Sequence, residues 1–174
     1  MRRTAIKWLH WLSLGFLLYF LAIEPEDVDR LGAAALATHA GVGMVFAVIV
    51  LSWFGMYLVK GLAGRPGPKL QGWAREAHIW SHRALYWSLV VMLLSGGLIG
   101  LFAPYVIQGF GIIPMLPNIP AKSFHDLMQE SHELLFNLLI GGVMLHAIFH
   151  LWRHTALRDN ALRVMMPKTL HRYL

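Results

Sequence analysis

The longest stretch without a formal charge constrains this chain more than any other feature. Residues 31–59 contain no Asp, Glu, Lys or Arg, and the stretch ends at Lys60. About 20 apolar residues in a helix cross the hydrocarbon core of a bilayer. Hydrophobic residues make up 57% of the 174-residue chain, which is more than an ordinary soluble domain contains. We therefore expect a helical membrane protein.

Three further stretches have the same character. Residues 8–23, 84–103 and 134–152 are also uncharged, and four prolines between residues 104 and 120 make a helix through that connection unfavourable. No small-residue cleavage pattern follows the first stretch, which argues against a removable signal peptide. We predict an all-α membrane protein in which one domain, residues 1–174, forms a four-transmembrane-helix bundle. The expected spans are about 4–23, 33–59, 82–103 and 124–154.

The basic residues fall on one side of this bundle. Thirteen of the 15 Lys and Arg residues flank the N-terminus, the connection between the second and third spans, or the C-terminal tail, and only Arg30 and Lys122 lie on the other side. The positive-inside rule then places both termini in the cytoplasm. Because the net charge of +6 follows the membrane in this way, we expect no nucleic acid partner.

Four histidines lie within the expected spans at two depths. His132 and His146 are fourteen residues apart, which is a rise of roughly 21 Å and a return to nearly the same helix face. By the same topology His39 shares the outer depth of His132, and His10 shares the inner depth of His146. Ionisable side chains within a membrane span are costly, so they mark candidate functional sites.

Two pairs of imidazoles at two depths fit two stacked haem b groups. The outer haem would take His39 and His132 as axial ligands, and the inner haem would take His10 and His146. A single histidine is more simply explained by a hydrogen bond between helices, but four at matching depths favour haem. A zinc or copper site would gather its ligands at one depth. The absence of cysteine excludes thiolate-held iron–sulfur clusters and covalent c-type attachment.

Other polar residues gather at the expected cytoplasmic ends of the last two spans. His150 and His154 continue the stripe of His146 in four-residue steps, and His150 is an alternative ligand to His146. His78 opens the third span one turn before His82 and is either part of a site or an interfacial side chain in contact with water. We predict a quinone site formed by a group of four residues. These residues are His150, Arg153, His154 and His78.

The pattern resembles the bacterial cytochrome b561 family, the small four-span di-haem cytochromes that include superoxide oxidase. The resemblance covers nearly the whole chain and rests on His10-Trp11, the THAGVG stretch at 38–43, and Ser131-His132-Glu133 followed by His146. It implies haem b at the same four histidines, electron transfer across the bacterial inner membrane, and ubiquinone as a partner. The fourteen-residue spacing is also similar to that in the haem subunits of formate dehydrogenases and nickel–iron hydrogenases.

The resemblance leaves the electron donor open. A quinone-linked oxidoreductase similar to superoxide oxidase would take its electron from superoxide, yet the position just before His154, where that resemblance implies a further histidine, is Arg153. The expected outer face carries two basic residues against seven acidic ones, which repels an anion and suits a basic periplasmic donor protein. The alternative is a membrane anchor or cytochrome b subunit of a larger dehydrogenase or hydrogenase-type complex. The seven acidic residues are Glu24, Glu26, Asp27, Asp29, Asp126, Glu130 and Glu133.

Overall fold

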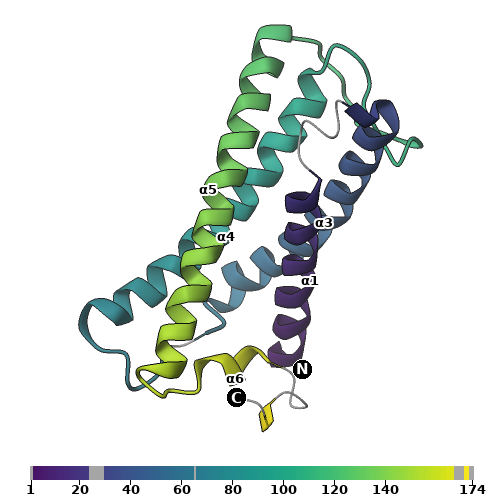
Figure 1. Cartoon of the computed structure of the whole chain (residues 1–174). Coiled ribbons are helices and arrows are strands. Elements are labelled where there is room, and N and C mark those ends of the chain that lie inside the picture. Colours follow the sequence, from purple (N-terminus) through teal and green to yellow (C-terminus); the bar gives the residue numbers. More distant parts are fainter. Residues whose placement is uncertain (1, 24–29, 65, 167–170, 173–174) are drawn as a thin grey trace.

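The protein is a bundle of four long helices. The computed structural model describes residues 2–23, 30–64, 66–166 and 171–172. The helices are α1 (Arg2–Ala22), α3 (Ala33–Lys60), α4 (Gly72–Phe102) and α5 (Lys122–Thr155), and they run along one another (Figure 1). Each is long and apolar enough to cross a membrane. The prediction of an all-α, four-helix membrane bundle is confirmed.

A two-stranded hairpin and a short helix distinguish the ends of the bundle. The strands β1 (Gln108–Gly109) and β2 (Ile113–Pro114) pair antiparallel in the connection between α4 and α5. The short helix α6 (Ala161–Met165) follows α5 at the opposite end, next to the start of α1 (Figure 1). We refer to the end with β1 and β2 as the hairpin end and to the end with α6 as the α6 end. The proline-rich connection is non-helical as predicted, but its hairpin was not predicted.

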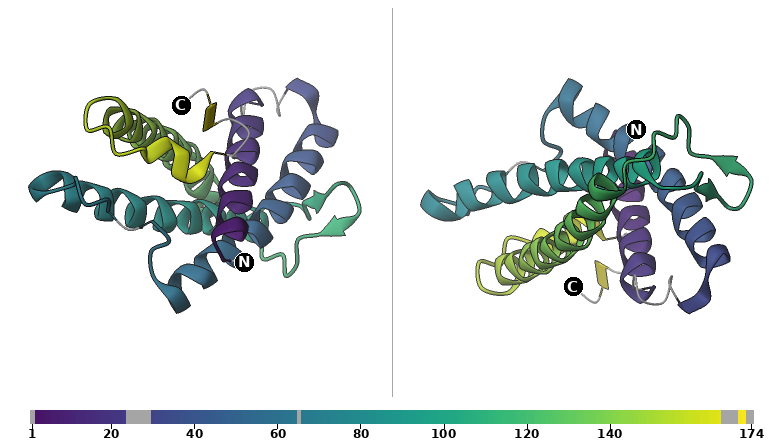
Figure 2. Two further views of the ribbon diagram at one scale, coloured as in Figure 1. Left: turned by 90° about the horizontal axis from the view of Figure 1, so that it is seen from below. Right: turned by 90° about the horizontal axis from the view of Figure 1, so that it is seen from above.

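The four helices are arranged as two pairs. α4 packs most extensively against α5, and α1 packs against α3, while α3 also meets α4 (Figure 2). The helix α4 begins at Gly72, well before the predicted span of 82–103. Its polar first turns contain no helix-breaking residue, and they bury Ala74 and His78, so the helix continues beyond its apolar portion.

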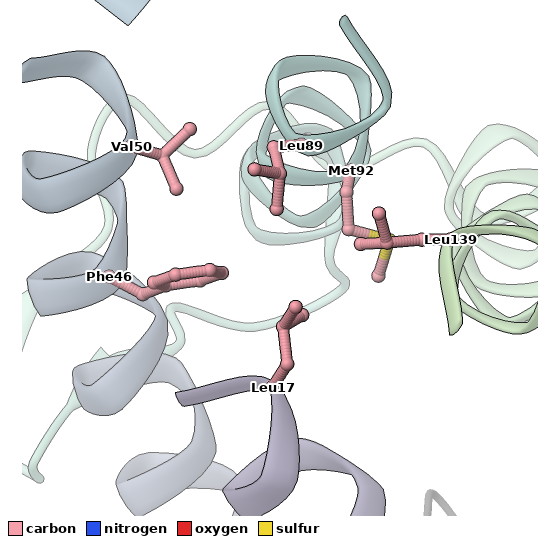
Figure 3. Packing of buried hydrophobic residues seen from close by; sticks show 6 residues of the cluster. All are labelled: Leu17, Phe46, Val50, Leu89, Met92 and Leu139. Atoms are coloured by element: carbon pink, nitrogen blue, oxygen red, sulfur yellow. The ribbon is translucent and has the colours of Figure 1, made fainter. Parts of the chain in front are cut away.

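The apolar core lies midway between the two ends of the bundle. Its six buried side chains come from all four helices and point toward one another (Figure 3). Leu17, Phe46 and Leu139 each follow a histidine of their own helix by seven residues, which is about two turns and returns to the same face. The core therefore fills the level between two sets of histidines. The six residues are Leu17, Phe46, Val50, Leu89, Met92 and Leu139.

Candidate functional site

Two of the predicted ligands face each other at the hairpin end. The ring centroids of His39 on α3 and His132 on α5 are 6.4 Å apart, with an interplanar angle of 72°. Two imidazoles that bind one metal from opposite sides have ring centres on the order of 6 Å apart, because each metal–nitrogen bond is about 2 Å long. The separation of His39 and His132 therefore suits two axial ligands of one haem iron.

Two residues of α4, Ser95 and Gly96, position the His132 ring. Ser95 Oγ lies 2.8 Å from His132 Nδ1 and donates a hydrogen bond to the Met92 carbonyl, also at 2.8 Å. A Cβ added at Gly96 would lie 3.2 Å from His132 Cε1. The Nδ1–Cε1 edge of the ring thus meets a hydroxyl and a backbone position without a side chain, and both contacts orient the ring.

The two predicted ligands near the α6 end have other aromatic neighbours. His10 on α1 makes edge contacts with Trp11 and Trp53, at centroid distances of 5.6 and 6.2 Å. His146 on α5 contacts His82 at 4.7 Å and His150 at 4.5 Å. The structure therefore brings His39 and His132 together in ring contact, whereas the pairing of His10 with His146 stays a prediction.

The buried nitrogens of these rings fit an imidazole-ligated group. Within the described part of the chain, Nδ1 of His10, His39 and His146 is buried and has no hydrogen-bond partner. A buried polar atom left unpaired costs roughly 1–3 kcal/mol, so such positions are retained where they serve a ligand. Imidazoles on facing helices are the donor set that b-type haem takes, and the residues present fit that group.

Three further histidines form a cluster beside His146. The rings of His78 and His82 are 4.2 Å apart, and that of His150 lies 5.7 and 5.5 Å from them. One nitrogen from each of the three lies within 4.8 Å of the others. His82 donates from Nδ1 to the His78 carbonyl at 2.6 Å. Nε2 of His150 is buried with no partner among the described residues.

A buried arginine determines what this cluster can bind. Arg153 is 5% exposed, donates to His78 Nδ1 at 3.2 Å, and forms a salt bridge of 2.7 Å with Asp159. Because guanidinium has no acceptor, His78 Nδ1 must accept, and the ring proton is on Nε2, 3.3 Å from the Gly64 carbonyl. With His78 engaged at both nitrogens and a cation beside it, the cluster suits a polar organic group better than a metal ion.

The residues predicted for a quinone site are brought together in part. His78, His150 and Arg153 are connected through the contacts above, whereas His154 lies one turn beyond His150, with Nδ1 buried and no partner in the described residues. Asp159 was missed because it follows the end of α5. Arg158 and Asn160 on either side of it have positive φ angles of 49° and 58°, which turn the chain back. An Asn in this turn is the signal that indicates such a reversal.

A cavity adjoins the histidine cluster at Gly64. It has a volume of about 480 Å³, and its lining includes Tyr57, Gly64 and Arg83. A Cβ added at Gly64 would lie 3.8 Å from His78 Nε2 and 3.9 Å from His82 Nε2. Both nitrogens therefore lie close behind the Gly64 wall of the cavity, and the volume is in the range of sites for small organic ligands.

Comparisons with known proteins identify the family of this chain. Residues 2–168 match the family described as prokaryotic cytochrome b561. The chain is 24% identical over 176 residues to the "Probable superoxide oxidase CybB" of Yersinia pestis, which covers 92% of each chain. It is 27% identical over 173 residues to "Cytochrome b561 homolog 1" of Escherichia coli (strain K12), which covers 92% of this chain and 94% of the relative.

Proposed function

This chain belongs to the prokaryotic cytochrome b561 family, and from that premise we propose that it is a di-haem cytochrome linking a periplasmic electron donor to ubiquinone. Its family and its four apolar helices make it a multi-pass membrane protein of haem-b electron transfer. The further steps, two haems, a quinone and the bacterial inner membrane, are our proposal. The observation that carries it is the presence of histidines at two levels of the bundle, separated by the apolar core.

Four histidines would hold the cofactors. His39 and His132 would bind one haem at the hairpin end, and His10 and His146 would bind the other nearer the α6 end. Bound haem b supplies one-electron redox chemistry, and its potential is set by the protein around it. The chain's own contribution is to fix the rings and to keep water out of the level between them with Leu17, Phe46 and Leu139 side chains.

We place the quinone at the α6 end, in the cavity beside Gly64. His78 carries a proton on Nε2 because Arg153 donates to its Nδ1, and His82 has a free Nε2 because its Nδ1 donates to a carbonyl. His78 Nε2 donates to the Gly64 carbonyl at 3.3 Å, whereas His82 Nε2 is an acceptor close to Gly64, which lines the cavity. Reduction of a quinone takes up two protons with two electrons, and the free Nε2 of His82 is suited to accept a hydrogen bond from a hydroxyl of the quinol that forms.

We propose that the hairpin end faces the periplasm and that both termini lie in the cytoplasm, as the distribution of basic residues indicates. Superoxide is one candidate donor, supported by the similarity to the probable superoxide oxidase of Yersinia pestis. A basic donor protein is the other, supported by the acidic residues expected on this face. Of these, Glu24, Glu26, Asp27 and Asp29 lie outside the described residues.

Haem content is the first test of the proposal. Purified protein should hold two haems b per chain, with the spectrum of low-spin iron because both axial positions are taken by histidine. One haem per chain would remove the di-haem proposal, and none would remove the electron-transfer function altogether. A co-purifying iron–sulfur or molybdenum protein would favour the alternative of a membrane subunit in a larger complex.

Rapid mixing identifies the donor and the acceptor. Superoxide mixed with the oxidised protein should reduce the haems, and added ubiquinone should speed their reoxidation. A rate that falls with salt would indicate local attraction of the anion, and one that rises would show that the acidic face dominates. Negligible reduction would exclude superoxide and leave a protein donor. If reduced ubiquinone fails to reduce the oxidised haems, the quinone proposal is wrong.

A further inference from the structure

One ligand of the hairpin-end pair differs from the other three predicted ligands. Nδ1 of His132 has a hydrogen-bonding partner, Ser95 Oγ at 2.8 Å. In the described part of the chain, Nδ1 of each of the other three is buried and unpaired. Ser95 is itself 5% exposed, so water does not compete for this bond. The contact crosses from α4 to α5 and is part of the most extensive helix interface of the bundle.

The hydroxyl proton of Ser95 determines the direction of this bond. Ser95 Oγ lies 2.8 Å from the Met92 carbonyl, which can only accept a hydrogen bond. A serine hydroxyl has one proton and two lone pairs. If that proton goes to Met92, then Oγ accepts from His132, and the His132 ring carries its proton on Nδ1. The nitrogen left with a free lone pair is then Nε2.

We propose that Ser95 is a positioning residue: by accepting a hydrogen bond from His132 Nδ1 it selects Nε2 as the ligand nitrogen at the hairpin-end haem and lowers the reduction potential of that haem. This inference rests on the proposed function. A hydrogen bond accepted from the distal ring nitrogen raises the basicity of a metal-bound histidine. A more basic ligand favours the oxidised iron, so the potential falls relative to a ligand without the bond.

Gly96 provides a second, independent contact between α4 and the His132 ring. A Cβ at this position would lie 3.2 Å from His132 Cε1 and 3.7 Å from Nδ1, whereas a Cβ at the adjacent Gly97 would meet no atom within 4 Å. A side chain at residue 96 would push the ring back by a few tenths of an ångström, so Gly96 lets the ring approach the α4 backbone and the Ser95 hydroxyl closely. Ser95 fixes the proton and Gly96 fixes the position of the same ring.

The test compares Ser95→Ala with Ser131→Ala in the complete, haem-loaded protein. Ser131 adjoins His132 in sequence, but its hydroxyl bonds the Leu127 carbonyl of its own helix. Reduction potentials are measured for both haems, and again in a His10→Ala background in which only the hairpin-end haem should remain. In Ser95→Ala we expect that haem to shift about threefold or more toward its reduced form, which is about 30 mV at 59 mV per tenfold for one electron. Ser131→Ala should leave both potentials unchanged, and Ser95→Thr should retain most of the original value.

The outcomes separate this inference from the proposed function. Two haems in the wild type with an unchanged or lowered hairpin-end potential in Ser95→Ala would overturn the role of Ser95 and leave the function intact. A wild type without haem would overturn the function itself. If Ser95→Ala loses its haem, the spectra of Gly96→Ala and Gly97→Ala are compared instead. An altered low-spin spectrum in Gly96→Ala alone supports the positioning of the His132 ring by α4. Equal spectra of the two variants refute it.

Discussion

The two ends of the bundle are held together by different kinds of interaction. At the hairpin end the connection 103–121 contains no charged residue, and uncharged groups hold it in place. Phe110 N–H donates to the Ala37 carbonyl at 2.7 Å and Ile119 N–H to the Leu101 carbonyl at 2.8 Å. The Asn118 side chain donates to the Ala103 carbonyl at 3.0 Å. At the α6 end, charged side chains hold the segments together. Lys69 donates to the Leu157 carbonyl at 3.0 Å, and Arg153 pairs with Asp159.

This difference indicates that the two ends of the bundle have different functions. The uncharged connection at the hairpin end adds no formal charge to the surroundings of His39 and His132. The α6 end holds a buried ion pair and three clustered histidines, and histidine is a side chain that can exchange protons. The arrangement matches the proposed roles, with electron entry at the hairpin end and quinone chemistry at the α6 end.

Removal of one ligand from each end should have the largest effect. His132→Ala should empty the hairpin-end haem site, and His10→Ala the site nearer the α6 end, so that each variant keeps one haem of two. Haem content is measured for each variant, and the haem that remains is characterised by redox titration. His125→Ala is the control, because its Nδ1 bonds only the Ile99 carbonyl among its described contacts. Loss of both haems in both variants would show that the two sites are not independent.

Asp159→Ala should destabilise the α6 end by about 3–5 kcal/mol, since it leaves the buried Arg153 guanidinium without its anion. Thermal unfolding in detergent measures this change, with the exposed Glu133→Ala as a control near zero. His78 should also lose its fixed orientation, so quinone reduction should slow even in molecules that stay folded. Equal stability of the two variants would contradict the assignment of a structural ion pair.

Gly41→Ala should destabilise the hairpin end by about 1–3 kcal/mol, the usual cost of overpacking. An added Cβ would overlap the Phe110 ring, which closes the hairpin onto α3 two residues from His39. Gly43→Ala is the matched control, because its Cβ would meet no atom within 4 Å. The difference in unfolding temperature between the two variants is the readout, and the absence of any difference would mean that the hairpin is not packed against α3.

Trp11→Phe should have the smallest effect and lower the free energy of unfolding by about 0.5–1.5 kcal/mol. It removes the hydrogen bond from the indole nitrogen to the Met165 carbonyl, 3.0 Å long, which ties α6 to α1. Trp8→Phe is the control, as Trp8 is 66% exposed. Limited proteolysis after α5 should proceed faster in the Trp11 variant alone. Equal rates would show that this bond does not hold α6 in place.

The sequence predicted best what depends on single helices. The lengths of the uncharged stretches located four helices. The predicted topology put His39 at the depth of His132, and the centroids of these two rings lie 6.4 Å apart. The contact of His78 with Arg153 depends on how α4 and α5 are rotated against each other, and hydropathy carries no information on that rotation. The two-residue strands of the hairpin are too short to show an alternating pattern.

The apolar core between the two histidine levels has a consequence for energy conservation. Leu17, Phe46 and Leu139 carry no group that binds a proton or an ion, so under the proposed function an electron would be the charge that crosses this layer. A charge that crosses the full membrane potential exchanges about 2.3 kcal/mol per 100 mV, and an electron crossing this layer meets part of that drop. Turnover should therefore respond to membrane voltage, with its sign set by the direction of electron flow.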